Sequence, residues 1–288
     1  MSDLSFDVAR GETLGVVGES GCGKSSAAMA VMQLSKGATG SVRLDGEEIT
    51  ELPASRERLQ RRAYQLVFQS PQASLNPRRK IGEIIAEGLR IWGCDDVDER
   101  VDSVMQSVGL DTALRNRLPR ELSGGQCQRV NIARALAVEP KLIVCDEPVS
   151  ALDVSVQAQV LNLLRDLRRE LDLSMMFISH DLGVVKFVSD RVLVLYLGKT
   201  CELAPTATLF SQPRHPYTHS LISALPSAAT RGITTKSVPN AEIPSPINPP
   251  AGCRFSTRCV LATERCRIEE PALVNVGEDH WVACHHPV

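Results

Sequence analysis

The sequence predicts an α/β fold with a three-layer core around a parallel sheet, because strand-sized apolar runs alternate with helical patterns. Residues 141–145 and 174–179 are apolar enough to form buried strands, and residues 155–171 between them have the spacing of a long amphipathic helix. Hydrophobic residues make up 43% of the 288 residues, but aromatic residues make up only 4%. Leu, Val, Ile and Ala must therefore fill the core.

Further elements are predicted on the N-terminal side of these strands. Residues 5–18 have the pattern of two short strands around an Arg-Gly turn, and a glycine-rich loop follows them. The remaining predicted elements are a helix at about 24–34, a strand at 41–44, a charged helix at 56–62 and a strand at 63–68. Strands and helices thus alternate from the start of the chain.

Three parts are predicted along the chain. Residues 1–204 form the α/β domain, with a mostly helical and polar lobe inserted at about residues 71–121. Prolines recur in residues 205–252, and residues 231–250 resemble a linker wrapped over a surface. Residues 253–288 contain four cysteines and form a small cysteine-rich appendage.

Composition and charge exclude several classes of protein. The net charge of −2 and the lack of a long basic run argue against a nucleic-acid-binding protein, which needs a basic face. No apolar stretch reaches the roughly 20 residues that span a bilayer. The N-terminus has no basic start followed by an apolar run, as a secretory signal would. We therefore expect a soluble, cytosolic protein that can still dock on a membrane protein.

Residues 18–25, GESGCGKS, match the phosphate-binding loop pattern G-x-x-x-x-G-K-[ST] between a predicted strand and a predicted helix. The glycines let backbone N–H groups turn toward phosphates, and the N-terminus of the following helix adds positive potential. Lys24 supplies a charge to the β- and γ-phosphate oxygens, and the Ser25 hydroxyl ligates Mg²⁺. The predicted phosphate-binding residues are Gly18, Glu19, Ser20, Gly21, Cys22, Gly23, Lys24, Ser25 and Ser26.

Two adjacent carboxylates, Asp146 and Glu147, follow the apolar run at residues 142–145. A buried strand delivers them to its carboxyl end, where open α/β sheets bind ligands. Asp146 is expected to hold Mg²⁺, through water, and Glu147 is placed to polarise an attacking water as a general base. An apolar run followed by Asp-Glu is a weak signal alone, but the upstream phosphate-binding loop strengthens it.

A second anion-binding element, LSGGQ, occupies residues 122–126 before a helix predicted at residues 129–138. Ser and Gly residues ahead of a helix offer free backbone N–H groups and the positive end of the helix dipole. The residues of this element that are expected to contact phosphate are Ser123, Gly124, Gly125 and Gln126.

With these two elements in one chain, residues 4–205 resemble the nucleotide-binding domains of ABC ATPases, whose signature is LSGGQ. The resemblance implies a P-loop ABC-type nucleotide-binding domain with an inserted helical subdomain, here followed by the cysteine-rich extension. It also implies a head-to-tail dimer with a second ATPase subunit, identical or not. In such a dimer the signature of one subunit covers the γ-phosphate bound by the other.

The same resemblance assigns roles to three further residues. Gln69 matches the glutamine that senses Mg²⁺ and the attacking water, so Mg²⁺ would be held by Ser25, Gln69 and Asp146. Asp153, in the segment SALD at residues 150–153, matches the loop that crosses the dimer interface. His180 matches the switch histidine that contacts the γ-phosphate. The catalytic residues implied are Glu147, His180 and Gln69.

A narrower resemblance concerns three motifs: SLNPR at residues 74–78, RHPYT at 214–218 and ALP at 224–226. Together with the terminal cysteines they are similar to the oligopeptide/dipeptide permease ATPase subunits. This implies an ATP-hydrolysing subunit of an ABC importer of peptides or similar small solutes, peripheral on the cytoplasmic face of the cell membrane. Its implied partners are two transmembrane permease subunits and, indirectly, an extracytoplasmic solute-binding protein. His215 and Tyr217 of RHPYT receive no chemical role, since packing explains them as well as ligation does.

The four cysteines of the appendage are spaced C-x5-C-x6-C-x17-C, wider than the C-x2-C pairs of most zinc sites. The spacing matches the set that holds a [4Fe–4S] cluster in the peptide-permease relatives, and four thiolates are the usual complement of such a cluster. Zinc and free thiols are the alternatives. The proposed cluster ligands are Cys253, Cys259, Cys266 and Cys284. His285 and His286 are possible substitute ligands that we expect at the surface instead.

Soluble ABC ATPases of DNA maintenance or translation and small-molecule kinases are the two alternative classes. ABC ATPases of DNA maintenance insert very long coiled coils between the two phosphate-binding elements, and the interval between Ser25 and Leu122 is too short for one. Translation-factor members carry two ATPase domains, and a small-molecule kinase would leave LSGGQ unexplained.

ABC ATPase family members also carry an upstream strand whose aromatic residue stacks on adenine. The first residues here do not contain it, so we expect it upstream of Met1 or looser adenine binding.

Overall fold

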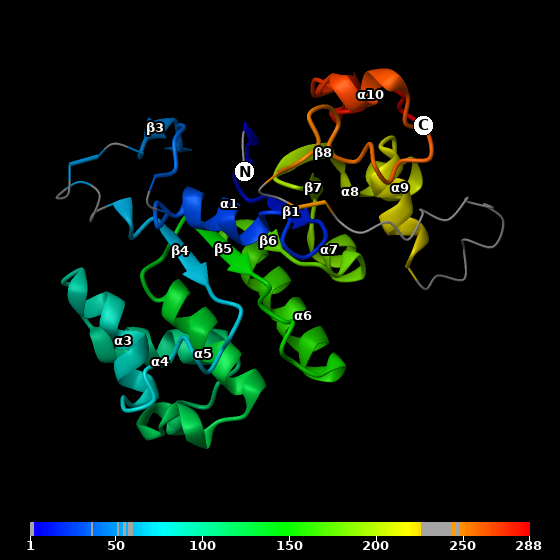
Figure 1. Ribbon diagram of the computed structural model, residues 1–288. Coiled ribbons are helices and arrows are strands. Elements are labelled where there is room, and N and C mark those ends of the chain that lie inside the picture. Colours follow the sequence, from blue (N-terminus) through cyan, green and yellow to red (C-terminus); the bar gives the residue numbers. More distant parts are fainter. Residues whose placement is uncertain are drawn as a thin grey trace. The chain divides into compact units, whose positions relative to one another are not determined.

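The computed structural model describes residues 3–35, 37–50, 52–53, 56, 60–225, 244–245 and 248–288 (Figure 1). The chain divides into two compact units, and each is described by itself. Unit 1 consists of Met1–Asp7, Thr13–Ala27 and Ile178–Val288. Unit 2 consists of Val8–Glu12 and Ala28–Phe177.

The sheet of unit 1 contains, in spatial order, β1 (Thr13–Val17), β7 (Arg191–Tyr196), β8 (Lys199–Pro205), β10 (His280–Val282) and β9 (Val274–Gly277). β1 and β7 are parallel, whereas β7 with β8, β8 with β10 and β10 with β9 are antiparallel. All five residues of β1 are buried, as its apolar sequence TLGVV predicts for a strand covered on both faces.

The described residues of unit 1 also form four short helices, and α1 (Lys24–Val31) begins in this unit directly after the glycine-rich loop. α7 (Leu182–Val188) contacts β1, and α8 (Thr206–Ser211) contacts β7 and β8. α9 (Pro216–Ser223) packs on β8, and α10 (Glu264–Ile268) belongs to the cysteine-rich appendage.

The described strands of the main sheet in unit 2 follow the order β4 (Tyr64–Val67), β5 (Leu142–Asp146) and β6 (Ser174–Ile178). β4 and β5 are parallel, with Val67 opposite Cys145. The hairpin formed by β2 (Arg43–Leu44) and β3 (Glu47–Glu48) lies apart from this ladder.

The helices of unit 2 pack on one another around α3 (Ile81–Ile91), which contacts both α4 (Val97–Ser107) and α5 (Gly124–Leu136). Two 3-10 helices, Thr112–Asn116 and Pro119–Glu121, connect α4 to α5, and α6 (Val154–Leu171) follows β5. The predicted lobe at residues 71–121 is therefore helical from Ile81 onward. Its helices belong to the same compact unit as β4 and β5, so the structure does not separate them as a subdomain.

Two of the predicted elements differ from the structure. The strand expected before the Arg-Gly turn is absent from described residues 3–12, where backbone donors have side-chain partners instead of a strand ladder. The N–H of Ala9 donates to the Glu12 carboxylate at 2.6 Å, and the N–H of Gly11 donates to the Ser174 hydroxyl at 3.0 Å. The signature helix begins at Gly124, five residues before the predicted start.

Several predicted features lie partly outside the described residues. These are the charged helix at 56–62, of which residues 57–59 are not described, and the linker at 231–250, of which residues 231–243 and 246–247 are not described. Pro226 of the ALP motif also lies outside them. The division of the chain at residues 204 and 252 stays a prediction.

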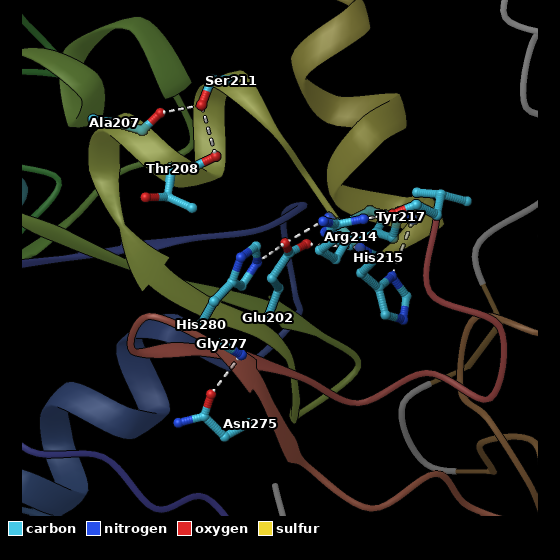
Figure 2. A network of polar contacts seen from close by, with 11 residues as sticks. Glu202, Ala207, Thr208, Ser211, Arg214, His215, Tyr217, Asn275, Gly277 and His280 are labelled. Atoms are coloured by element: carbon cyan, nitrogen blue, oxygen red, sulfur yellow. Dashed lines mark hydrogen bonds and ion pairs between the residues drawn. The ribbon is translucent and has the colours of Figure 1, made fainter.

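A buried carboxylate, Glu202 on β8, holds the C-terminal part of unit 1 together (Figure 2). It accepts hydrogen bonds from the backbone N–H groups of Arg214 at 2.7 Å and His215 at 2.9 Å, and the ring of His280 lies 2.6 Å away. Glu202 is 0% exposed, and a buried charge is tolerated only when hydrogen bonds satisfy it. The carboxylate thus fixes the start of α9 and β10 against β8.

His215 caps α9, because its Nδ1 accepts a hydrogen bond at 3.0 Å from the backbone N–H of Tyr217. The side chain is 1% exposed, and this burial lowers the pKa of His215 to about 4. The cap requires the neutral ring, since a protonated Nδ1 cannot accept a hydrogen bond. Packing and capping, rather than ligation, thus account for this histidine.

Acidification should destabilise the fold through His215. Its folded-state pKa of about 4 lies below the value of 6.5 that the unfolded chain has, so the unfolded state binds the extra proton between these pH values. The stabilising contribution is present above about pH 6.5 and should have fallen by roughly 2 kcal/mol at pH 5. Urea unfolding at pH 7.5 and pH 5.0 measures this change.

The matched variant is His215→Asn, which keeps a side-chain acceptor for the helix cap and removes the titrating ring. It should lose less stability than the parent protein between the two pH values. An equal loss in both proteins would show that other groups cause the acid sensitivity.

Candidate functional site

The phosphate-binding loop lies in unit 1, between the buried strand β1 and the start of α1. Lys24 is 6% exposed, and its ammonium group donates to the carbonyl oxygens of Gly18 at 2.8 Å and Glu19 at 3.1 Å. The loop therefore holds its own lysine, with the charged group directed to the turn that the glycines form.

Gly18 is required at its position by close packing. A Cβ atom there would lie 2.2 Å from the carbonyl oxygen of Leu195 and 2.6 Å from the sulfur of Cys22, far inside contact distance. Cys22 is held in turn, because its carbonyl oxygen accepts a hydrogen bond at 2.8 Å from the N–H of Gly198. The end of β7 and the turn that follows it thus contact the phosphate-binding loop directly, and only glycine fits at position 18.

Ser25 and Ser26 lie at the exposed N-terminal end of α1, where the first backbone N–H groups have no partner inside the helix. This end of a helix favours anions. His180 is also exposed in unit 1 and directly follows Ser179, whose N–H donates to the carbonyl oxygen of Val16 at 3.1 Å. His180 therefore lies next to the carboxyl end of β1.

Gln69 and Glu147 are brought together in unit 2 by the parallel register of β4 and β5. Val67 lies opposite Cys145, and each of the two polar residues comes two positions later, just after its strand. Gln69 Nε2 donates a hydrogen bond of 2.9 Å to Glu147 Oε2. The two residues predicted to handle the attacking water are thus in direct contact.

Asp146 ends β5 and is buried, with 9% of its surface exposed. Glu147 has a φ of +48°, a left-handed backbone that non-glycine residues seldom adopt. Such strain costs about 1–3 kcal/mol and is concentrated at functional sites. It turns the backbone out of the strand direction at the position where Glu147 meets Gln69.

The LSGGQ element forms the N-terminus of α5. Ser123 Oγ accepts a hydrogen bond from the N–H of Gln126, and Gln126 Oε1 accepts one at 2.9 Å from the N–H of Ser123. This reciprocal pair is a capping box, and it leaves the first-turn N–H groups of Gly124 and Gly125 without a partner inside the helix. An exposed Ser123 beside such N–H groups fits the predicted anion-binding element.

Asp153 caps the neighbouring helix, since its Oδ1 accepts hydrogen bonds from the N–H of Val156 at 3.0 Å and from the Ser155 hydroxyl at 2.7 Å. The hydrogen bond from Val156 makes the largest contribution to lowering the pKa of Asp153, and the bond from Ser155 adds to it. A Cβ atom on Gly125 would lie 2.4 Å from a Val156 methyl group, so the starts of α5 and α6 are in close contact.

Asn131, a functional candidate that the sequence did not reveal, ties the segment after Gln69 to α5. It is 0% exposed, and its side chain bonds to the Pro71 carbonyl oxygen at 3.0 Å and the Ser74 hydroxyl at 2.8 Å. Arg134 donates to the Ser74 carbonyl oxygen at 2.8 Å. The helix that starts with the signature thus also fixes the start of the SLNPR motif.

The structure does not confirm the cluster predicted at the four appendage cysteines. Among the residues that the structure describes, no group of three or more His, Cys, Asp or Glu side chains is arranged to hold a metal ion. Burial first, and then the other three thiols of the set, raise the pKa of Cys284 to about 11, so the thiols are electrostatic neighbours. His285 and His286 have other partners, the Glu269 carbonyl oxygen at 3.0 Å and the Thr263 hydroxyl at 2.9 Å.

Family models match two parts of the chain. The ABC transporter model matches residues 1–150, and the model of the oligopeptide/dipeptide transporter C-terminal region matches residues 201–266. The first contains the phosphate-binding loop, LSGGQ and the acid pair, and the second contains RHPYT and three of the appendage cysteines.

Similar proteins extend over almost the whole chain. The oligopeptide transport ATP-binding protein OppF of Haemophilus influenzae is 50% identical over 99% of this chain and 87% of its own length. OppF of Escherichia coli is 54% identical over 98% of this chain and 86% of its own length. A putative peptide import ATP-binding protein of Brucella ovis is 49% identical over 99% of this chain and 90% of its own length.

Two solved structures share the fold. The cbiO1 part of a Clostridium perfringens ABC transporter complex is similar with a TM-score of 0.66 and 26% identity, covering 72% of this chain and 82% of that one. A dimeric ATP-binding cassette in a post-hydrolysis state, bound to ADP and Pi, has a TM-score of 0.62 and 29% identity, covering 70% and 88%.

The fold and the two anion-binding elements define a P-loop ATPase of the ATP-binding cassette type. The chain belongs to the ABC transporter family. Within the part of the chain that the structure describes, none of its helices has the length and apolar character needed to cross a bilayer.

Gly125→Ala should destabilise the protein, because the new Cβ atom would lie 2.4 Å from Val156 Cγ1 and force the two helix starts apart. Overpacking of this kind costs about 1–3 kcal/mol. The matched control is Gly124→Ala, whose Cβ atom would make an ordinary contact of 3.6 Å with Leu152. Alanine there should be neutral or stabilising by up to about 1 kcal/mol, because it favours the helix.

Urea unfolding of both variants distinguishes these effects. The double variant Gly125→Ala/Val156→Ala should recover part of the loss by making room for the methyl group. Equal stability of the two single variants would contradict the close contact between α5 and α6.

Proposed function

We propose that this chain is the ATP-hydrolysing subunit of an importer and that it couples ATP hydrolysis to the uptake of peptides or similar small solutes. The observation that carries this proposal is the match of residues 201–266 to the oligopeptide/dipeptide transporter C-terminal region. Relatives named for oligopeptide transport are 50–54% identical over nearly the whole chain, which supports the same substrate class. Separate permease subunits and a solute-binding protein would select the solute.

Binding of the nucleotide is proposed to use the residues of the phosphate-binding loop. Lys24 is buried at the turn of the loop, and the exposed N-terminal end of α1 offers its N–H groups to the phosphates. Ser25, Gln69 and Asp146 would hold Mg²⁺, and hydroxyl, amide and carboxylate oxygens are ligands that this ion accepts. When bound, the ion supplies neutralising charge at the β- and γ-phosphates.

Hydrolysis is proposed to proceed by in-line attack of water on the γ-phosphorus. A bond forms between the water oxygen and phosphorus, the bond to the bridging oxygen of ADP breaks, and Glu147 accepts the proton of the water. The hydrogen bond from Gln69 supports this role, because it fixes the orientation of the Glu147 carboxylate. His180 is assigned to contact the γ-phosphate.

A second ATPase subunit is proposed to complete the site. The capped N-terminus of α5 presents Ser123, Gly124 and Gly125, and these would cover the γ-phosphate held by the partner subunit. Asp153 would lie at the same interface. The assembly is proposed to be peripheral on the cytoplasmic face of the membrane, bound to two transmembrane permease subunits and not to nucleic acid.

The base assignment is tested with Glu147→Gln in the assembled transporter. The amide keeps the size of the side chain and cannot accept the proton, so ATP turnover should fall at least about a hundredfold. ATP binding should be retained, and the ATP-bound dimer should accumulate. Phosphate release and size-exclusion chromatography measure the two effects.

The isosteric control is Glu170→Gln on the exposed surface of α6, which should leave turnover unchanged. Hydrolysis at the parent rate in Glu147→Gln would remove Glu147 from the mechanism without affecting the assignment to the family.

We also propose that Cys253, Cys259, Cys266 and Cys284 bind a [4Fe–4S] cluster, with zinc as the alternative. Support comes from the spacing and from the mutual effect of the thiols on their pKa values. The positions of the described side chains do not form a metal site, so cluster binding would require the thiols to move closer together. No step of hydrolysis depends on this cluster.

Metal analysis of protein purified without oxygen tests the cluster. A [4Fe–4S] cluster gives a brown protein with about four iron and four sulfide per chain. Cys259→Ser should abolish both, whereas Cys94→Ser, outside the appendage, should not. Colourless protein with stoichiometric zinc would favour the alternative, and protein without metal would reject both.

A further inference from the structure

The cysteine-rich appendage reaches the phosphate-binding loop through one arginine. Arg258 directly precedes Cys259, and its guanidinium forms a two-pronged ion pair with the Glu19 carboxylate. Nη1 lies 2.6 Å from Glu19 Oε2, and Nη2 lies 3.0 Å from Oε1. Both residues belong to unit 1, although 239 positions separate them in the sequence. Two parallel bonds of this kind fix geometry as well as charge.

The arginine is itself held in place by aromatic residues. Its side chain is 13% exposed and lies over the rings of Tyr196 and Phe255, at 5.7 and 5.8 Å from the ring centroids. Nη1 also donates to the Tyr196 hydroxyl at 3.3 Å. Because an arginine guanidinium is not deprotonated in proteins, this ion pair keeps its positive partner at every working pH.

Glu19 is bound at its backbone N–H as well. This N–H donates to the Tyr217 hydroxyl at 3.0 Å, and the Tyr217 ring packs against Tyr196 and Phe255. The carbonyl oxygen of Glu19 accepts a hydrogen bond from the ammonium group of Lys24. Tyr217 and Arg258 thus fix Glu19 from two sides, and the carbonyl oxygen of Glu19 in turn holds the lysine of the loop.

We propose that Arg258 is a positioning residue for nucleotide binding, which holds Glu19 in place and neutralises its carboxylate beside the phosphate-binding loop. Without Arg258 an unpaired negative charge would lie next to the polyphosphate, and the contact between Glu19 and Lys24 would lose its support. The inference rests on the proposed role of the phosphate-binding loop. It gives the C-terminal extension a part in ATP binding in addition to any role of its cysteines.

The test is R258Q in the full-length protein, with binding of a fluorescent ATP analogue displaced by MgATP or by inorganic pyrophosphate. The dissociation constants of MgATP and pyrophosphate should both rise by about tenfold, because the effect is on the phosphates and not on the base. R258K keeps the charge but not the two-pronged geometry, and it should show a smaller rise of about two- to fourfold. R258K carries the test if R258Q does not fold, and unchanged affinity in R258K would then overturn the proposal.

The matched control is R265Q, which removes another two-pronged arginine–carboxylate pair of the same appendage. That pair joins Arg265 to Glu269, four residues later in the sequence, and both side chains are exposed. R265Q should leave both dissociation constants within twofold of the parent. A loss equal to that of R258Q would mean that any disturbance of the appendage weakens binding, and it would overturn the specific role of Arg258.

The decisive variant is the double change E19Q/R258Q, which removes the unpaired charge. It should bind pyrophosphate more tightly than R258Q and recover most of the tenfold loss, which a purely structural role of Arg258 would not produce. No recovery, or R258Q within twofold of the parent, would overturn the proposal. The K24A variant separates this inference from the proposed site, because normal nucleotide binding in K24A would reject the phosphate-binding loop itself.

Discussion

The parallel register of β4 and β5 is the constraint on which the candidate catalytic residues of unit 2 depend. Pairing Val67 with Cys145 places the residues that follow the two strands at one edge, so that Gln69 and Glu147 meet there. A shift of one residue would turn every side chain of the strand to the opposite face. Ile143, Val144 and Cys145 of β5 are buried in consecutive positions, so both faces of the strand are covered and a shift would require both to repack. Core packing thus fixes the geometry of the site.

The local arrangement of the candidate site could be predicted from the sequence wherever a few adjacent residues define it. The phosphate-binding loop and the Asp146–Glu147 pair are of this kind, because their spacing within one segment already determines which groups can converge. The start of α5 was placed too late, since two glycines oppose helix formation by about 1 kcal/mol each. The capping box between Ser123 and Gln126 offsets part of this cost, and its pattern S-x-x-Q was the available signal.

Contacts between distant segments could not be predicted in the same way. Nothing local distinguishes Arg258 from the other arginines of the appendage, and its partner Glu19 lies in the first strand-loop-helix unit. Asn131 is similar, because its buried amide is recognisable only once α5 packs beside Pro71 and Ser74. The strand expected before Gly11 fails for a related reason. Side chains of Glu12 and Ser174 bind its backbone donors, and the second of these comes from another part of the chain.

The C-terminal extension is better understood as part of the nucleotide-binding unit than as an independent attachment. Glu202 lies on β8 and is fully buried, so its carboxylate needs the N–H groups of Arg214 and His215 and the ring of His280. Removing those partners would leave a buried charge unsatisfied, at a cost of several kcal/mol. The position of β8 beside β7 therefore depends on residues near the end of the chain. The turn between these two strands, which binds Cys22, depends on them in the same way. This dependence explains why residues 178–288 and the phosphate-binding loop form one compact unit.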